Sequence, residues 1–140
     1  MKKFVLDTNV ISELRKGSRA DAQVVAWVDN HDFNAFYISV ITLFELEMGV
    51  RRKERSDPVQ GKALRQWLDR LREDVFVERI LPISTQTALI NASLNVPDLH
   101  QSADSWIAAT AIEHNMAVVT RNVKDFHSID VEVINPWRLE

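Results

Sequence analysis

The chain has 140 residues, of which 46% are hydrophobic and 26% charged, and this is the composition of an ordinary globular domain. The absence of cysteine excludes disulfide bonds, thiolate zinc sites and cysteine nucleophiles. A net charge of −3 is unlike that of most polyanion-binding proteins, which are basic, so a nucleic-acid partner would require a local source of positive charge.

Short apolar runs alternate with longer amphipathic stretches, and no repeat or linker divides them. In chain order the pattern predicts a strand at 4–6, helices at 10–16 and 20–29, a strand at 36–39, helices at 41–55 and 58–73, a strand at 79–82, helices at 85–94 and 103–115, and strands at 117–120 and 131–134. The strands are nearly continuous in Val, Ile and Leu, as burial on both faces requires. We therefore expect an α/β fold in a single domain over residues 1–140, with a short, mostly parallel central sheet and helices on both faces.

No segment is suited to a membrane or to export. The longest nearly apolar stretch, residues 36–44, is far too short to span a bilayer. The apolar run that begins at Phe4 stops at Asp7, before it could form the hydrophobic part of a signal peptide. We expect a cytoplasmic protein without membrane contact.

Polar side chains follow the predicted strands at the edge of the sheet where parallel α/β folds bind ligands. Asp7 comes directly after the first strand, and Asn122 and Asp125 come after the fourth. Glu45 lies one turn into the helix that follows the second strand, and Asp104 lies in the first turn of the last predicted helix. If these two helices also begin at that edge, the acidic side chains converge.

Each acid also has a purely structural interpretation. Asp7 is a favoured helix N-cap, and residues 42–45 match a capping box that ends at Glu45. Asp104 would complement the dipole of its helix, and Asp125 would be solvated in a polar turn. These alternatives explain each residue singly, but not why the acids follow the strands together.

Convergence of the acids would be costly without a cation. Two carboxylates about 4 Å apart repel by roughly 4 kcal/mol at an effective dielectric near 20, and three or four together approach the whole stability of a small domain, about 5–15 kcal/mol. Oxygen ligands of this kind suit Mg²⁺, or Mn²⁺, and such an ion can hold phosphate oxygens and activate water. The pattern predicts a metal-dependent nuclease. The four histidines form no His-x-x-x-His pair and are interpreted as structural or surface residues, with His100 and His127 as minor candidates for the site.

Five segments, in this order and at this spacing, resemble the PIN-domain toxins of the VapC/FitB kind. They are LDTNVISE at 6–13, SVITLFELEMG at 39–49, ADSWIAATA at 103–111, VTRNVKDF at 119–126 and INPW at 134–137. The resemblance covers nearly the whole chain. It implies a parallel-sheet α/β fold, Mg²⁺- or Mn²⁺-dependent cleavage of RNA, a cognate antitoxin that blocks the site, and a toxin homodimer.

Carried over by position, Asp7, Glu45 and Asp104 match three acids of that family. The fourth acid falls at the place of Asn122 in some relatives and at the place of Asp125 in others. We expect Asp7 and Asp104 to bind the metal directly. Glu45 would bind it directly or through water, or position the nucleophile, and Asp125 or Asn122 would fill the fourth place.

Three polar residues are candidates for supporting roles. Asn9 and Thr120 would orient carboxylates or phosphate, and Thr8 would touch phosphate; turn and cap chemistry is the alternative for all three. The candidate RNA contacts are Arg121 and two arginines of a basic run, Arg51 and Arg52, for which a solvated helix end is the alternative.

Two other functions remain open. A phosphatase or another Mg²⁺-dependent phosphoryl-transfer enzyme would also place an Asp after the first strand, although many have a second Asp at the place of Asn9. A non-catalytic binding module would use a helical groove lined by tryptophans or, for an antitoxin, by Val24, Trp27 and Val28. Core packing is the alternative for these apolar residues. The tryptophans concerned are Trp27, Trp67, Trp106 and Trp137.

Overall fold

The structure, a computed structural model, describes residues 1–99 and 102–139. Its strands are β1 (Phe4–Leu6), β2 (Phe36–Ser39), β3 (Ile80–Leu81), β4 (Ala117–Val119) and β5 (Val133–Ile134). Its α-helices are α1 (Thr8–Arg15), α2 (Ala22–Asp29), α3 (Val40–Ser56), α4 (Pro58–Arg70), α5 (Thr85–Leu94) and α6 (Ala103–Glu113). Short helical turns complete the description: η1 (Gly17–Arg19), η2 (Phe33–Ala35), η3 (Leu71–Val75) and η4 (Val123–Phe126).

The strands form one sheet in the order β3-β2-β1-β4-β5, and every neighbouring pair is parallel. In the central register Phe4 pairs with Phe36 on one side and with Ala117 on the other. All five strands therefore end at the same edge, and the predicted α/β fold with a parallel sheet is confirmed.

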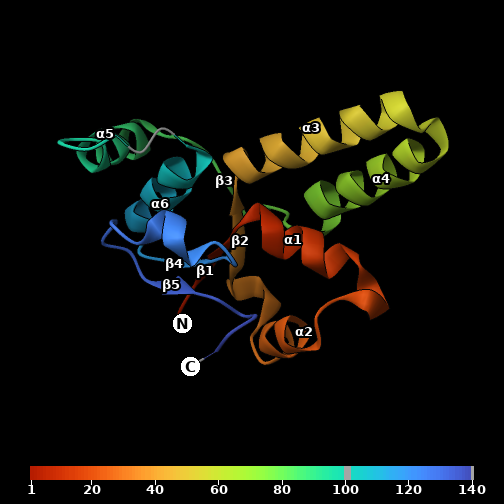
Figure 1. The fold of residues 1–140 in the computed structure, drawn as a ribbon, viewed down its shortest axis with the longest axis horizontal. Helices are drawn as coiled ribbons and strands as arrows, with labels where there is room; N and C mark the ends of the chain where they lie inside the picture. The colour runs from red at the N-terminus through yellow and green to blue at the C-terminus, as the bar shows by residue number, and fades with distance from the viewer. Residues whose placement is uncertain (100–101, 140) are drawn as a thin grey trace.

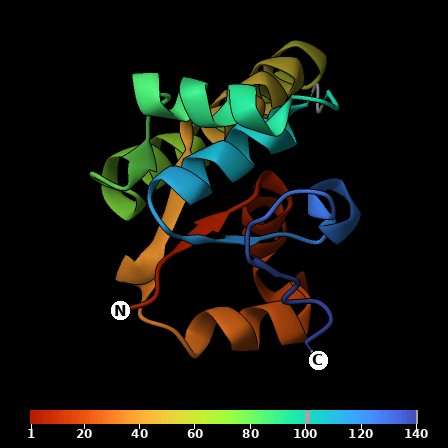
Figure 2. The same cartoon turned by 90° about the vertical axis from the view of Figure 1, so that its left-hand side faces the viewer.

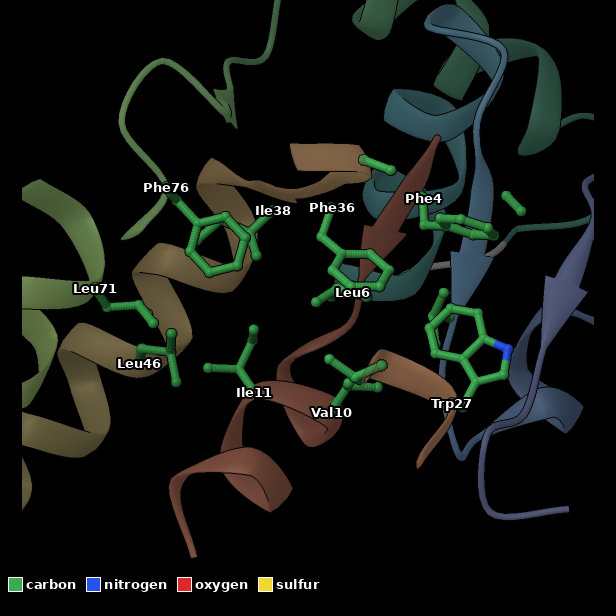
Figure 3. Packing of buried hydrophobic residues seen from close by; sticks show 14 of the residues in the cluster. Phe4, Leu6, Val10, Ile11, Trp27, Phe36, Ile38, Leu46, Leu71 and Phe76 are labelled. Atoms are coloured by element: carbon green, nitrogen blue, oxygen red, sulfur yellow. The ribbon is translucent and has the colours of Figure 1, made fainter. Parts of the chain in front are cut away.

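Helices cover both faces of this sheet (Figures 1 and 2). Successive side chains of a strand point to opposite faces, so each strand contributes to the apolar packing on both. Phe4 and Leu6 point into a core that also contains residues of α1, α2, α3 and α4 (Figure 3). Val5, between them, points to the opposite face, where it joins Ile107 and Ala108 of α6. Both faces of β1 are thus fully buried, which fits its uninterrupted apolar sequence.

The structure corrects several sequence predictions. The first helix begins at Thr8 rather than at residue 10, because Asp7 caps it. The α-helix predicted to reach residue 73 ends at Arg70, and the π-helical turn η3 follows it directly. The turn expected around Asp125 is the short 3₁₀ helix η4.

Core packing is confirmed for Val24, Trp27 and Val28, since all three are buried in the protein and therefore do not line an open groove on α2. The ring of Trp27 packs edge-on against Phe4, as Figure 3 shows. His31 belongs to the same aromatic group, in agreement with its structural interpretation. Over the described residues 1–99 and 102–139, no helix is long and apolar enough to cross a membrane.

Helices α3 and α4 fold back against each other (Figure 1). An ionic network joins the two helices. Arg65 of α4 donates two hydrogen bonds to Glu47, at 2.6 and 2.8 Å, and also contacts Glu54. These bonds from Arg65 lower the pKa of Glu47 to about 2. The same helix pair is close enough at Gly61 that an added Cβ would lie 2.5 Å from the Cα of Glu54.

Replacing Gly61 by alanine should therefore destabilise the helix pair. The new methyl group meets backbone that cannot move without shifting a helix, and overpacking of this kind costs about 1–3 kcal/mol. The measurement is urea unfolding followed by circular dichroism. Gly49→Ala is the matched control, because Gly49 lies in α3 with open space around it and alanine should stabilise the helix there by about 0.5–1 kcal/mol. Equal stability of the two variants would contradict the close-packing argument.

Candidate active site

Asp7 lies at the carboxyl end of the central strand and is held there by the backbone. Its amide N–H donates to the carbonyl of Val119 at 2.9 Å, which continues the pairing of β1 with β4. Its Oδ1 accepts a hydrogen bond from the amide of Thr8 at 2.7 Å, so Asp7 also caps α1. The position of Asp7 at the end of β1 therefore explains both its capping of α1 and its place in the site.

The second carboxylate oxygen of Asp7 joins a polar network. Oδ2 accepts from the hydroxyl of Thr120 at 2.8 Å and from the amide of Asn9 at 3.3 Å. Only 4% of Asp7 is exposed, and this burial raises the pKa of its carboxyl. The bonds from Thr120 and Thr8 oppose the rise, whereas the nearby charge of Glu45 adds to it.

Glu45 comes to the same place on α3. The helix begins directly after β2, and its N-cap is Ser39, whose hydroxyl accepts from the amide of Thr42 at 3.2 Å. The predicted capping box at 42–45 is therefore wrong, since Thr42 already lies inside the helix and Glu45 one turn further on. The hydroxyl of Thr8 donates to Oε1 of Glu45 at 2.6 Å and so ties α1 to α3.

Asp104 lies in the first turn of α6, half-buried, on the other side of the site. Burial raises its pKa to about 7, and the charges of Asp7, Asp125 and Glu45 contribute to the rise. Protonated Asp104 can donate a hydrogen bond to Asp125, which raises the pKa further. The acids from four separate segments are thus close enough to act on one another.

The two candidates for the fourth position differ in their surroundings. Asn122 lines the cavity in front of the acids, and its amide N–H donates to the hydroxyl of Thr120 at 3.0 Å. Asp125, on η4, lies outside that lining but acts by charge on both Asp7 and Asp104. The structure brings both residues to the site, in different ways.

A cavity of about 650 Å³ opens in front of these side chains. Its lining residues are Asp7, Thr8, Asn9, Ser12, Glu13, Lys16, Glu45, Ser102, Ala103, Asp104, Arg121, Asn122 and Trp137. The sequence analysis named Asn9 but missed Ser12, Glu13 and Lys16, which continue from Asn9 along one face of α1 to its C-cap. The spacing of three and four residues was the available signal, since it places all of them on one helix face beside Asp7.

The candidate RNA contacts separate in space. Arg121 lines the cavity. Arg51 instead pairs with Glu47 at 2.6 Å on the exposed side of α3, and neither Arg51 nor Arg52 is part of the lining. His100 lies outside the described residues, and His127 is exposed and outside the lining.

The donor set fits a hard divalent cation better than any other common metal. The described residues that line the cavity offer carboxylate and amide oxygens and include neither histidine nor cysteine, and Mg²⁺ and Mn²⁺ prefer such oxygen ligands. The raised pKa of Asp104 shows negative charge that a cation would compensate. Within the described part of the chain, however, no three of the acidic or histidine side chains already form a closed ligand cluster.

Comparison with known proteins decides the family. The family model of the PIN domain matches residues 4–132. The chain belongs to the PIN domain family. Toxin FitB of Neisseria gonorrhoeae is 37% identical, in an alignment that covers 96% of this chain and 98% of FitB. VapC ribonuclease Y4jK of Sinorhizobium fredii is 35% identical, with 96% and 97% covered.

Solved structures agree with this assignment. The structure of FitAB bound to the IR36 DNA fragment superposes on this PIN domain with a TM-score of 0.83 and 35% identity, over 98% of this chain and 97% of the other. The resemblance identified from the five sequence segments is therefore confirmed. Membership of the PIN ribonuclease family implies use of a divalent metal ion.

Replacing Asp104 by asparagine should stabilise the metal-free protein at high pH. Folding raises the pKa of Asp104 to about 7 from its ordinary value of 3.8, so the unfolded chain releases this proton at lower pH than the folded protein does. The free energy of unfolding of the wild type therefore falls as pH rises from about 4 to 7 and stays low above pH 7. Asp104→Asn lacks this loss, and we expect an advantage of about 1–2 kcal/mol at pH 8, reduced by solvent screening of a partly exposed group.

Thermal and urea unfolding in EDTA, at pH 4 and pH 8, measure this difference. The advantage of Asp104→Asn should be small at pH 4, where the wild-type carboxyl is protonated in the folded state. If the difference in unfolding free energy between the two proteins does not grow from pH 4 to pH 8, the folded protein does not disfavour the charged form of Asp104.

Proposed function

We propose that this PIN domain is a divalent-metal-dependent endoribonuclease and the toxin of a toxin–antitoxin pair. The observation that carries the proposal is the convergence of Asp7, Glu45, Asp104 and Asp125 at the carboxyl edge of the sheet. There the burial and mutual charge of the acids raise the pKa of Asp7 and of Asp104. Such a cluster in an open cavity is suited to hydrolysis of a phosphodiester bond.

Asp7 and Asp104 would hold the metal ion, for which Mg²⁺ is the preferred candidate and Mn²⁺ the second. Glu45 would bind the ion directly or through water, or position the attacking water, and Asp125 or the carbonyl of Asn122 would complete the fourth position. The ion supplies charge compensation for the phosphate and a water of lowered pKa.

The surrounding polar residues would hold these carboxylates in place. Thr120 donates to Asp7 and accepts from both the side chain of Asn9 and the backbone of Asn122. Thr8 donates to Glu45 from the first turn of α1. With these bonds made, Asp7 and Glu45 cannot rotate freely, and a fixed carboxylate geometry is what a catalytic metal requires.

The relatives support the choice of substrate and partner. Several are named ribonucleases, and the structural neighbours at 26–35% identity include FitAB and a DNA-bound VapBC complex. We infer RNA as the substrate, a cognate antitoxin as the partner, a toxin homodimer, and the cytoplasm as the site of action.

The phosphatase alternative is weaker on this geometry. Many aspartyl-phosphate enzymes need a second Asp two residues after the first, and here Asn9 binds Asp7, Thr120 and the amide of Arg121. A binding module that uses its tryptophans is also weaker, since Trp27 is buried and Trp67 packs against the core.

Asp7→Asn and Asp104→Asn should each lower RNA cleavage on the order of 100-fold or more while the fold is retained, because each removes a charged metal ligand. The measurement is cleavage of end-labelled RNA, with circular dichroism as the check of folding. Glu73→Gln is the control, because Glu73 is exposed on η3 and lies outside the cavity. Full activity in both folded Asp variants would remove the proposed site.

EDTA should abolish RNA cleavage, and Mg²⁺ or Mn²⁺ should restore it, because the carboxylates repel a phosphate when no cation is bound. The measurement is a titration of each ion into the EDTA-treated protein with the same RNA. A phosphomonoester assay run in parallel separates the nuclease from the phosphatase. Cleavage that persists without divalent ions would contradict the mechanism.

A further inference from the structure

Trp137 lies at the rim of the carboxylate cavity, in a segment that the sheet itself brings there. It follows β5, which pairs with β4, and the amide of Thr120 donates to the carbonyl of Ile134 at 2.9 Å. The amide of Trp137 donates in turn to the side chain of Asn135 at 2.9 Å. The indole is half-buried: it packs against the core and also lines the cavity.

Arg121 covers the indole of Trp137. Its guanidinium carbon lies 5.3 Å from the centre of the ring, which is the geometry of a cation–π contact. Its backbone is fixed as well, because its amide donates to Oδ1 of Asn9 at 3.1 Å. The two flat groups therefore stand together at one side of the cavity, on backbone that is tied to the carboxylate network.

Of the two described cations in the lining, Arg121 and Lys16, Arg121 is the less engaged: its charge helps to lower the pKa of Glu13 without a direct ion pair. Lys16 pairs with the buried carboxylate of Glu13 at 2.9 Å. Arg121 is exposed and, among the described residues, forms no salt bridge. An aromatic ring beside an unpaired guanidinium is what proteins use to bind single-stranded nucleic acid, with the base stacked and the phosphate neutralised.

We propose that Arg121, laid over the indole of Trp137, forms with it a stacking platform on which one unpaired nucleobase of single-stranded RNA rests against the guanidinium, next to the phosphate that is cleaved at the carboxylates. This inference rests on the proposed ribonuclease function and adds the two residues that would hold a base of the substrate. A base inside a duplex is already stacked and paired, so the platform selects unpaired RNA. It also supplies the local positive charge that a chain of net charge −3 requires.

The test is steady-state cleavage of a short unpaired RNA and of the same RNA annealed to its complement. Trp137→Leu keeps an apolar side chain against the core but cannot stack, so KM for the unpaired RNA should rise about 10-fold, with a smaller change in kcat. Trp137→Phe keeps a ring and should stay within about threefold of the wild type. Arg121→Lys keeps the charge but loses the flat guanidinium, and its KM should lie between the two.

A matched control is available in the same fold. Arg15 lies over the ring of Trp67 at 5.8 Å, in a groove on α1 and α4 that contains none of the acids. Trp67→Leu removes an indole of the same kind and should leave KM unchanged. Thermal unfolding of every variant confirms that each is folded at the assay temperature.

Binding provides a readout separate from turnover. In the Asp104→Asn background, titration of the unpaired RNA should quench tryptophan fluorescence, and adding Trp137→Leu should remove that quench and weaken binding about 10-fold. If the wild type does not cleave RNA, the proposed function fails. If the wild type cleaves RNA, three results would overturn the platform while the ribonuclease function stands. They are a wild-type KM in folded Trp137→Leu, a KM of Trp137→Phe as high as that of Trp137→Leu, and equal cleavage of the duplex and the unpaired RNA.

Discussion

The hydrogen bond from the Thr120 hydroxyl to the Asp7 carboxylate joins residues 113 positions apart, and the geometry of the site depends on it. It exists because β1 and β4 are neighbours and parallel, so that the residues following both strands leave the sheet at one edge. Asn9 and Asn122 bind the same hydroxyl group. One buried threonine thus connects the end of β4, the start of α1 and a carboxylate of the cavity.

The clustering of carboxylates that is suited to metal binding also lowers the stability of the metal-free fold. Asp7 is almost fully buried, and the pKa of both Asp7 and Asp104 is raised because each carboxylate loses water and faces other negative charge. A fold that tolerates such a cluster must be held firmly elsewhere. The apolar core on both faces of β1 provides that support, and Figure 3 shows the larger of its two clusters. The Arg65 network between α3 and α4 adds to it away from the acids.

The cavity combines two charge environments that serve different parts of a nucleic-acid strand. Asp7, which follows β1, and the acids of α3 and α6 lie where a cation and a phosphate would meet, whereas Arg121 and Trp137 lie at the rim. A net charge of −3 does not conflict with a polyanionic substrate, because four of the 20 acidic residues gather where a metal ion would compensate their charge. The exposed basic residues of α3 are not needed for this, and Arg51 is already paired with Glu47.

The sequence by itself determined the alternation of strands and helices, the parallel sheet and the acids that follow the strands. These features are local: a buried strand needs a continuous apolar run, and the residue after it must turn. The bounds of β1, β2 and α5 follow from such runs and agree with the structure. The family was also readable, because five motifs stand at fixed spacing along the chain.

Only the tertiary structure decided which groups meet. Sequence spacing cannot show that Glu45 accepts from Thr8 or that Arg121 covers Trp137, because these pairs form where separate strands end side by side. Nor could it show that Ser39 caps α3, since both Ser39 and Thr42 are good caps and the end of β2 decides between them. Burial and the closeness of other charges arise only when the sheet is packed. The raised pKa of Asp104 therefore cannot be predicted from the residues next to it in the sequence.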